Sequence, residues 1–408
     1  MIRLHFERAL KKLSCWLMVV VRDIFRRMCI ATREIMDCMY EVYYAHEGGI
    51  EPDDIPRTKE PVWILGKKYN ATKDLEKIRR EITSKIWCTY RKGFVPIGGG
   101  EGLTSDRGWG CMLRCGQMVL AQALVNLHLG RDWYWDIETK DPIYLKILQK
   151  FEDKRQAPFS IHQIALMGAS EGKNVGEWFG PNTVAQVLKK LAKYDEWSSL
   201  AIHVALDNLV IINEIRELCV PEQGNSQLLN LWKPLLLIVP LRLGLSEINP
   251  IYLNGIQSCF KLKQSLGIIG GKPNLALYFI GCVDMEVIYL DPHTSQRAGS
   301  IENKDTEDQV DLDQTYHCRR ASRMNILAMD PSIAVCFFCK TEAEFVDLCQ
   351  KIRDEVVTTE KQPLFEICTD RPREWSPGLD ITVEEAIGAC AIVDQRSAYY
   401  DSDEFEIV

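Results

Sequence analysis

The stretch Thr104-Ser-Asp-Arg-Gly-Trp-Gly-Cys-Met-Leu-Arg-Cys-Gly116 decides the fold, because it leads from a glycine-rich turn into a long apolar segment. From Cys111 onward nearly every position is apolar, which predicts a helix that is buried on all sides. Cys111 stands at the helix start, where unpaired N–H groups and the helix dipole favour an anion. Gly108 and Gly110 allow a tight turn and leave room for a chain to pass. The pattern therefore predicts a reactive thiol, with a buried core cysteine as the alternative.

A thiol nucleophile needs a base, and Val287-Ile-Tyr-Leu-Asp-Pro-His-Thr294 offers one. Four strand-forming residues lead into Asp291 and His293, which places both side chains at the end of a strand. If Pro292 bends the chain, Asp291 can orient the ring of His293 and fix its tautomer. A cysteine at a helix start, a later histidine and a carboxylate together indicate a papain-like site with an unusual third member.

Five longer motifs carry a resemblance to a known family. From about Pro61 to about Cys368 the sequence resembles the autophagins, the cysteine peptidases of autophagy, and is most similar to their vertebrate A-type members. The motifs are Pro61–Gly66, Gly108–Gln117, Gly180–Lys190, Gly270–Asn274 and Leu290–His293. The resemblance implies an α+β, papain-like cysteine peptidase fold with an inserted auxiliary subdomain. It also implies cleavage after the C-terminal glycine of ubiquitin-like autophagosome modifiers, both to mature their precursors and to release them from phosphatidylethanolamine at the autophagosomal membrane.

The resemblance also implies roles for single residues. It makes Cys111 the nucleophile, His293 the base and Asp291 the partner of the base. It makes Tyr90 a donor to the oxyanion hole.

Selectivity and regulation are expected from three further residues. The resemblance places Trp197 and Pro273 over the cleft, where they would leave a slot that only glycine can thread. The paired glycines of the loop Gly270–Asn274 predict a lid that lifts when substrate arrives. Cys115 follows Cys111 by one helical turn on the same face, which predicts a regulatory role in reversible oxidation.

Composition narrows the function. The 408 residues, 46% hydrophobic with ten tryptophans, suit a packed globular protein. A net charge of −8 without a basic patch argues against nucleic-acid binding. Fifteen scattered cysteines predict free thiols and a cytoplasmic location. Cys336-Phe-Phe-Cys339 has the form of a metal or redox site, but it lies in a strand-like run without a second pair, so we interpret it as core and expect no metal and no cofactor.

Short connections between apolar runs predict an antiparallel sheet in the second half of the chain. The runs are Leu235–Val239, Val287–Leu290 and Ile333–Cys339. Thr341-Glu-Ala-Glu344 forms a capping box that predicts the start of a helix.

Three parts are predicted along the chain. Residues 1–60 do not resemble the family, and their apolar and basic positions suit a helix packed on the peptidase, an interfacial helix or a transit-like peptide. Residues 61–375 form the peptidase domain. Residues 376–408 form an acidic tail that ends in Phe405-Glu-Ile-Val408, an aromatic-x-x-aliphatic pattern that can add to a sheet edge. The resemblance makes Phe405 and Val408 docking residues for the same modifiers.

Two other functions share some of these features. A different ubiquitin-like-specific cysteine peptidase would use the same Cys/His chemistry, but the long motifs argue against it. A catalytically inactive adaptor would bind modifiers through the tail, with residues 1–60 blocking the cleft. Every catalytic position carries a competent residue, so we favour the active peptidase. Selective alkylation of Cys111 would separate enzyme from adaptor.

Overall fold

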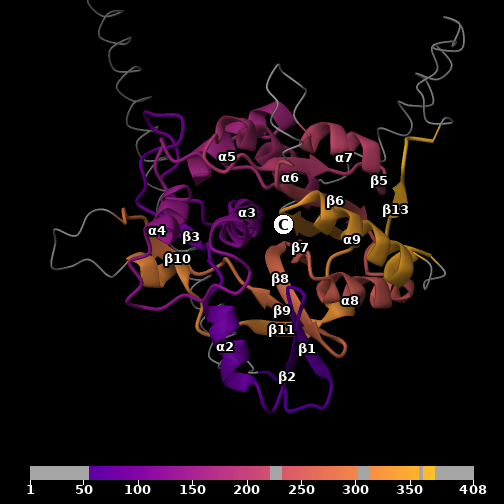
Figure 1. Cartoon of the computed structure of the whole chain (residues 1–408). Coiled ribbons are helices and arrows are strands. Elements are labelled where there is room, and N and C mark those ends of the chain that lie inside the picture. Colours follow the sequence, from indigo (N-terminus) through magenta and orange to yellow (C-terminus); the bar gives the residue numbers. More distant parts are fainter. Residues whose placement is uncertain (1–54, 221–231, 302–311, 358–361, 373–408) are drawn as a thin grey trace, which may run out of the picture.

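The computed structural model describes residues 55–220, 232–301, 312–357 and 362–372, and the predictions for residues 1–54 and 373–408 lie outside these ranges (Figure 1). The helices are α2 (Leu75–Thr83), α3 (Cys111–His128), α4 (Pro142–Gln149), α5 (Ile161–Met167), α6 (Pro181–Leu191), α7 (Ile212–Cys219), α8 (Leu253–Lys261) and α9 (Glu342–Ile352). The strands are β1 (Pro61–Ile64), β2 (Lys67–Asn70), β3 (Tyr90–Lys92), β4 (Ala201–Val204), β5 (Leu209–Ile211), β6 (Leu235–Arg242), β7 (Ser265–Lys272), β8 (Leu275–Val283), β9 (Glu286–Leu290), β10 (Ser295–Arg297), β11 (Ser322–Asn325), β12 (Ser332–Cys339) and β13 (Glu366–Cys368).

A nine-stranded sheet forms the centre of the described part of the chain. Seven of its strands follow the order β11-β9-β8-β7-β12-β6-β4, while β1 pairs with both β8 and β2. All these pairs are antiparallel except β4 with β6, which is parallel. The predicted antiparallel sheet and the α+β class are therefore confirmed, and the capping box at Thr341 begins α9, since its side chain accepts from the Glu344 N–H.

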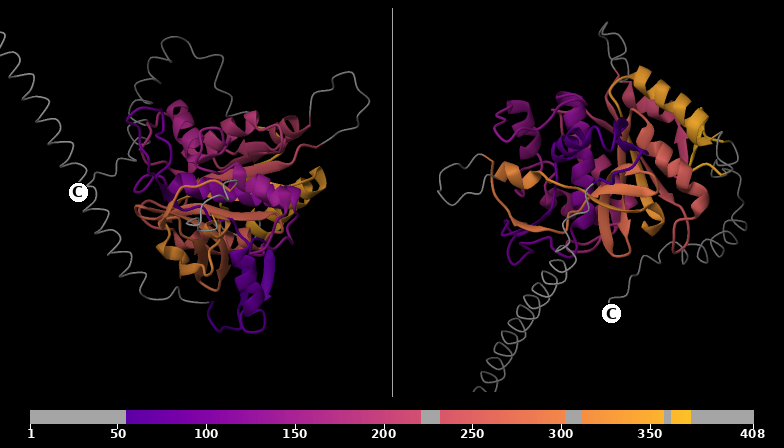
Figure 2. Two further views of the ribbon diagram at one scale, coloured as in Figure 1. Left: turned by 90° about the vertical axis from the view of Figure 1, so that its left-hand side faces the viewer. Right: turned by 90° about the horizontal axis from the view of Figure 1, so that it is seen from below.

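Helices cover both faces of the sheet, so its central strands are apolar on both sides (Figure 1). On one face, Ile269 and Tyr278 belong to the core that contains the residues of α3. On the other face, Ile268 and Phe279 share a core with α8 and α9. The two views in Figure 2 show the same layers from other sides. This packing explains why the strands have continuous apolar sequences instead of alternating ones.

The helix α3 is the buried centre of the first core, as its sequence predicts. Every residue from Cys111 to Val125 is buried. Gly116 allows α6 to approach, because a Cβ at this position would lie 2.5 Å from Cγ2 of Val184. The helix is thereby fixed on two sides, by the sheet and by α6, and its first residue has a defined place.

A small parallel pair, β3 with β10, brings two distant segments together. Tyr90 is opposite Ser295 in this pair. The N–H of Tyr90 donates to the carbonyl of Pro292 at 2.9 Å, and Nε1 of Trp87 donates to the carbonyl of Asp291 at 2.7 Å. These bonds hold the segment after β9 next to the segment before α3.

The segment Gly270–Asn274 is part of a tight hairpin and not a free loop. Gly270 and Gly271 lie within β7, and Pro273 and Asn274 form the turn to β8, with Asn274 at a φ of 64°. The expected lid is thus a hairpin tip, whose glycines serve close packing: a Cβ on Gly271 would lie 2.0 Å from the carbonyl oxygen of Leu275.

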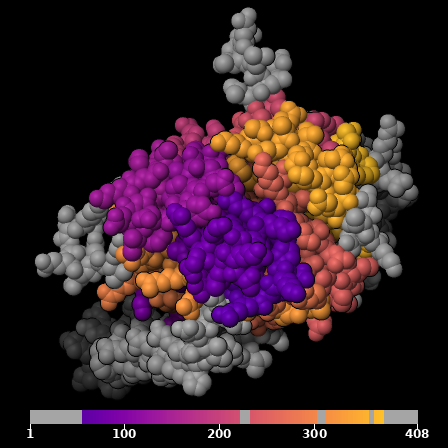
Figure 3. Space-filling view, turned by 60° about the horizontal axis from the view of Figure 1, so that its bottom comes forward, coloured from indigo at the N-terminus to yellow at the C-terminus, as the bar shows by residue number. Residues whose placement is uncertain are grey.

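The strands β1 and β2 and the helix α2 make one continuous region of the surface, drawn in indigo in Figure 3. Among the described helices, none combines the length and the apolar character that crossing a bilayer requires.

Candidate active site

Cys111 is the first residue of α3, directly after the N-cap Gly110. The residue is 2% exposed. No acidic side chain lies in the first turn of the helix, so nothing on that turn offsets the attraction of the helix dipole for a thiolate. The glycine-rich turn delivers the thiol to the position that the sequence predicts.

His293 and Asp291 meet at the end of β9. Nδ1 of His293 lies 2.5 Å from Oδ1 of Asp291, and the same oxygen accepts the backbone N–H of His293 at 2.9 Å. This pairing fixes the ring through Nδ1, and the imidazole and the thiol of Cys111 lie close enough to shift each other's pKa. The structure thus brings together the three residues that the sequence proposes as nucleophile, base and orienting acid.

The pKa values of these groups favour the charged pair. Burial raises the pKa of Cys111, but hydrogen bonding to His293 and its charge are the main effects that bring it below its ordinary value. Burial lowers the pKa of His293, yet Asp291 and Cys111 together raise it to about 9. Burial raises the pKa of Asp291, and the hydrogen bond and charge of His293 reverse this shift. The site therefore favours a thiolate beside an imidazolium, which is the nucleophilic form.

Tyr90 lies beside both groups. Its ring meets the imidazole of His293 edge-on, with centroids 5.4 Å apart, and its hydroxyl lies close enough to the thiol of Cys111 for the two groups to shift each other's pKa. Burial, and then the nearby Cys111, raises the pKa of Tyr90 well above its ordinary range, so the hydroxyl stays protonated. A fixed donor beside a nucleophile can stabilise the oxyanion of a tetrahedral intermediate. The structure places Tyr90 where such a role needs it.

The indole that covers the thiol belongs to Trp178, and the prediction that Trp197 lies over the cleft is wrong. Nε1 of Trp178 donates to Sγ of Cys111 at 3.1 Å. Trp197 stacks instead on His128, the last residue of α3, with ring centroids 3.9 Å apart. Residues 111 and 128 are separated by about 25 Å of helix, so Trp197 cannot reach the nucleophile.

The neighbouring residues explain the positions of Trp197 and Trp178. The ammonium groups of Lys146 and Lys150 each lie 4.7 Å from the ring centre of Trp197, and such cation–π contacts hold the indole in place. Trp178 lies two residues before Gly180, the first residue of the motif Gly180–Lys190 and the N-cap of α6. Its closeness to that motif was a signal in the sequence that could have identified it.

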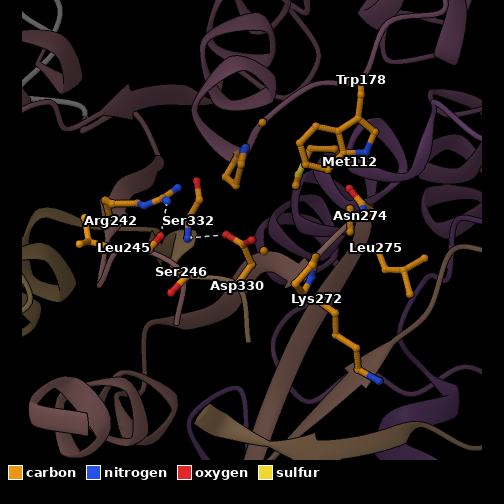
Figure 4. Close-up of a pocket in the computed structure, with 16 residues that line it drawn as sticks. Met112, Trp178, Arg242, Leu245, Ser246, Lys272, Asn274, Leu275, Asp330 and Ser332 are labelled. Atoms are coloured by element: carbon orange, nitrogen blue, oxygen red, sulfur yellow. Dashed lines mark hydrogen bonds between the residues drawn. The ribbon is translucent and has the colours of Figure 1, made fainter. Parts of the chain in front are cut away.

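A cavity of about 360 Å³ (Figure 4) is lined by Met112, the residue after Cys111, and by Trp178, but not by Cys111 itself. Trp178 and Ala276, which both contact the Cys111 thiol, form part of its wall. Pro273 at the hairpin tip also lines the cavity, as do Met112, Arg242 and Asp330. A concave site beside a nucleophile is the default place for a substrate, and Pro273 therefore lies where a slot residue is expected.

The remaining cysteines of interest are core residues. Cys115 is completely buried, and burial followed by the nearby Cys111 raises its pKa well above the ordinary value. Cys336 and Cys339 lie in β12 and belong to different cores on the two faces of the sheet, so their sulfur atoms cannot share one ligand. Within the described ranges no group of three or more His, Cys, Asp or Glu side chains could hold a metal. Phe405 and Val408 lie outside those ranges.

The sequence is similar to one protein family and to several of its characterised members. Residues 75–351 match the peptidase C54 catalytic domain. The cysteine protease ATG4A of Gallus gallus is 46% identical over 380 residues, which cover 87% of this chain and 99% of the relative. ATG4B of Gallus gallus is 48% identical over 389 residues, covering 88% and 96%. ATG4A of Bos taurus is 49% identical over 348 residues, covering 80% and 86%.

The predicted similarity to A-type members is therefore confirmed, and it extends to B-type members. The predicted domain limits at residues 61 and 375 remain predictions. The chain belongs to the peptidase C54 family, the autophagin cysteine proteases, and is a thiol protease with a papain-like α+β fold.

Proposed function

We propose that this protease cleaves after the C-terminal glycine of ubiquitin-like autophagosome modifiers of the GABARAP and light-chain-3 type. It would act on two amide bonds, one in the modifier precursor and one between the modifier and phosphatidylethanolamine. The observation that carries the proposal is the convergence of Cys111, His293 and Asp291 under the indole of Trp178.

The chemistry follows from this arrangement. The Cys111 thiolate attacks the glycyl carbonyl, and the oxyanion that develops lies near the hydroxyl of Tyr90 and the start of α3. His293 gives its proton to the leaving amine as the C–N bond breaks, which leaves a thioester on Cys111. Water then attacks the thioester while His293 takes a proton, and the modifier leaves with a free glycine carboxylate.

The proposal covers both leaving groups, because the amine of a following residue and the amine of an ethanolamine headgroup accept the same proton. The second reaction requires transient contact with the surface of the autophagosomal membrane. The described cysteines are all free thiols, which agrees with the reducing cytoplasm that we propose as the location. We propose no nucleic-acid partner and no cofactor.

Trp178 and Pro273 support the demand for glycine. Both line the cavity beside the thiol, and the indole also bonds the sulfur. A substrate carbonyl must therefore pass between an aromatic plane and a rigid hairpin tip to reach Sγ. Residues with a side chain would be rejected by steric exclusion, not by weaker attraction.

The test uses the purified chain with two substrates, a modifier precursor with a C-terminal reporter and the same modifier conjugated to phosphatidylethanolamine in vesicles. We expect cleavage of both at the same glycine, and no turnover by Cys111→Ala, which should still bind the precursor. Cleavage by Cys111→Ala would contradict the assignment of the nucleophile. An inactive adaptor would instead bind the modifier without cleavage, and its Cys111 would react with iodoacetamide no faster than the other cysteines.

A further inference from the structure

Asp106, five residues before Cys111, is completely buried and is hydrogen-bonded through both its carboxylate and its backbone. Oδ1 accepts the backbone N–H of Arg91 at 2.6 Å. Oδ2 accepts Nε of Arg114 at 2.7 Å. The carbonyl of Asp106 accepts the N–H of Gly110 at 2.8 Å. One residue therefore connects β3, the N-cap of α3 and the first turn of α3.

The residues that Asp106 bonds are neighbours of the catalytic residues along the chain. Arg91 directly follows Tyr90, whose side chain lies beside the thiol and the imidazole of His293. Gly110 directly precedes Cys111, and Arg114 lies on the same first turn of the helix. The thiol and the tyrosine hydroxyl come from segments about twenty residues apart, and Asp106 is bonded to the immediate neighbour of each.

The contact with Gly110 is very close. A Cβ on Gly110 would lie 2.5 Å from Oδ2 and 2.6 Å from Cβ of Asp106. The backbone just before the nucleophile thus packs directly on the carboxylate side chain. Any displacement of Asp106 would move the start of α3 with it.

Stability alone is a weak reason for this buried network. Burial raises the pKa of Asp106, and the charge of Arg114 opposes the shift. Arg114, 1% exposed, also bonds Asp153 at 2.9 Å. Buried ion networks of this kind can often be replaced by apolar residues at no loss of stability. The location of Asp106 between the catalytic segments supplies a different reason for a carboxylate here.

We propose that Asp106 is a positioning residue that sets the distance between the Cys111 thiol and the Tyr90 hydroxyl through its contacts with Arg91 and Gly110. This inference rests on the proposed role of Cys111 as the nucleophile. Asp106 itself takes no part in bond making or proton transfer. Its effect is geometric, and a displacement of about 1 Å in a reacting group can cost about 10²-fold in rate.

The test compares Asp106→Asn with Asp153→Asn. The two carboxylates face the same guanidinium of Arg114 and are both almost completely buried, at 0% and 2% exposure, but only Asp106 contacts Arg91 and Gly110. For Asp106→Asn we expect kcat on a modifier precursor to fall about 30- to 100-fold while KM changes less than about threefold. The pH midpoint of Cys111 alkylation by iodoacetamide should move towards that of an ordinary thiol. Asp153→Asn should show a similar fall in Tm but retain kcat within about threefold.

A second variant covers the case in which Asp106→Asn does not fold. Gly110→Ala pushes the N-cap away from Asp106 and leaves every charge in place, so kcat should fall in the same way. Equal loss of kcat in Asp106→Asn and Asp153→Asn at matched folded fraction, or an unchanged kcat in Gly110→Ala, would overturn the inference. The wild-type protein distinguishes this outcome from failure of the proposed function. If Cys111 of the wild type reacts with iodoacetamide no faster than the other cysteines, the proposed function itself is wrong.

Discussion

His293 lies between a carboxylate and a thiol, and these two neighbours hold its pKa at about 9. The pKa of Cys111 is shifted in the opposite direction, below its ordinary value. Because folding raises the pKa of His293 from 6.5, the protonation of this histidine stabilises the folded chain fully below about pH 6.5. This contribution is lost as the pH rises through about 9.

The same shifts predict the pH profile of activity. We expect kcat/KM to form a plateau that falls on the acid side as the Cys111 thiolate is protonated and on the alkaline side near pH 9 as His293 loses its proton. The measurement is kcat/KM on a modifier precursor between pH 5 and 10, as an experimental range chosen to span the ordinary pKa values of both groups. Asp291→Asn is the control, because it should lower the alkaline midpoint. Activity that only begins to rise above pH 8.5 would contradict the charged pair, since that is the behaviour of an ordinary thiol.

Two structural elements form the predicted slot for glycine. The hairpin β7–β8 contributes Pro273 and the segment before α6 contributes Trp178, and both residues line the same cavity. We predict that Trp178→Ala lowers kcat/KM on the normal precursor, because the indole no longer positions the chain. The variant should also relax the rejection of alanine at the cleaved position, which is measured as the ratio of kcat/KM for glycine and alanine precursors.

Trp197→Ala is the matched control for this prediction. It removes an indole of the same size from the far end of α3, where Trp197 stacks on His128, so stability should fall but the glycine-to-alanine ratio should not change. If Trp178→Ala and wild type show the same ratio, the slot formed by Trp178 and Pro273 does not determine selectivity.

The helix α3 carries two cysteines to which we assign different parts in a predicted response to oxidation: Cys111 is oxidised and Cys115 assists its recovery. Cys111 has the lowered pKa and should be the site that peroxide attacks, whereas burial and the raised pKa of Cys115 argue against direct oxidation there. We expect Cys115→Ser to lose activity at the same rate as wild type when peroxide is added. Its recovery with a dithiol should be less complete, because no neighbouring thiol protects the oxidised Cys111. Identical loss and recovery in both proteins would exclude Cys115 from regulation.

At the scale of the whole molecule, the acidic tail of residues 376–408 is a prediction from sequence that lies outside the described residues. If Phe405 and Val408 dock a modifier at a distance from the cleft, replacing both by alanine should raise KM for the intact precursor about tenfold, the effect of losing roughly 1.4 kcal/mol of binding. The value of kcat should stay unchanged, and a short peptide substrate with an amide-linked reporter after its glycine should show no difference. An equal change on the peptide would place the effect in the cleft instead.

The sequence by itself determined the reactive groups. Cys111 at a helix start and Asp291 and His293 at a strand end are local patterns, readable because dipole, turn and strand preferences act over a few neighbouring residues. The resemblance to the family added Tyr90 and Pro273. The buried helix followed from the nearly continuous apolar stretch after Cys111, and the antiparallel sheet followed from the short connections between apolar runs.

Only the tertiary structure decided which side chains from distant segments meet these groups. Trp178 is 67 positions from Cys111 along the chain, and apart from its closeness to the motif Gly180–Lys190 nothing in the sequence distinguishes its indole from that of Trp197. Asp106 reads in the sequence as an ordinary turn residue, and its burial between Arg91 and Arg114 depends on how β3 packs against α3. Contacts of this kind depend on the packing of whole elements, which is a property of the folded chain and not of any one stretch of it.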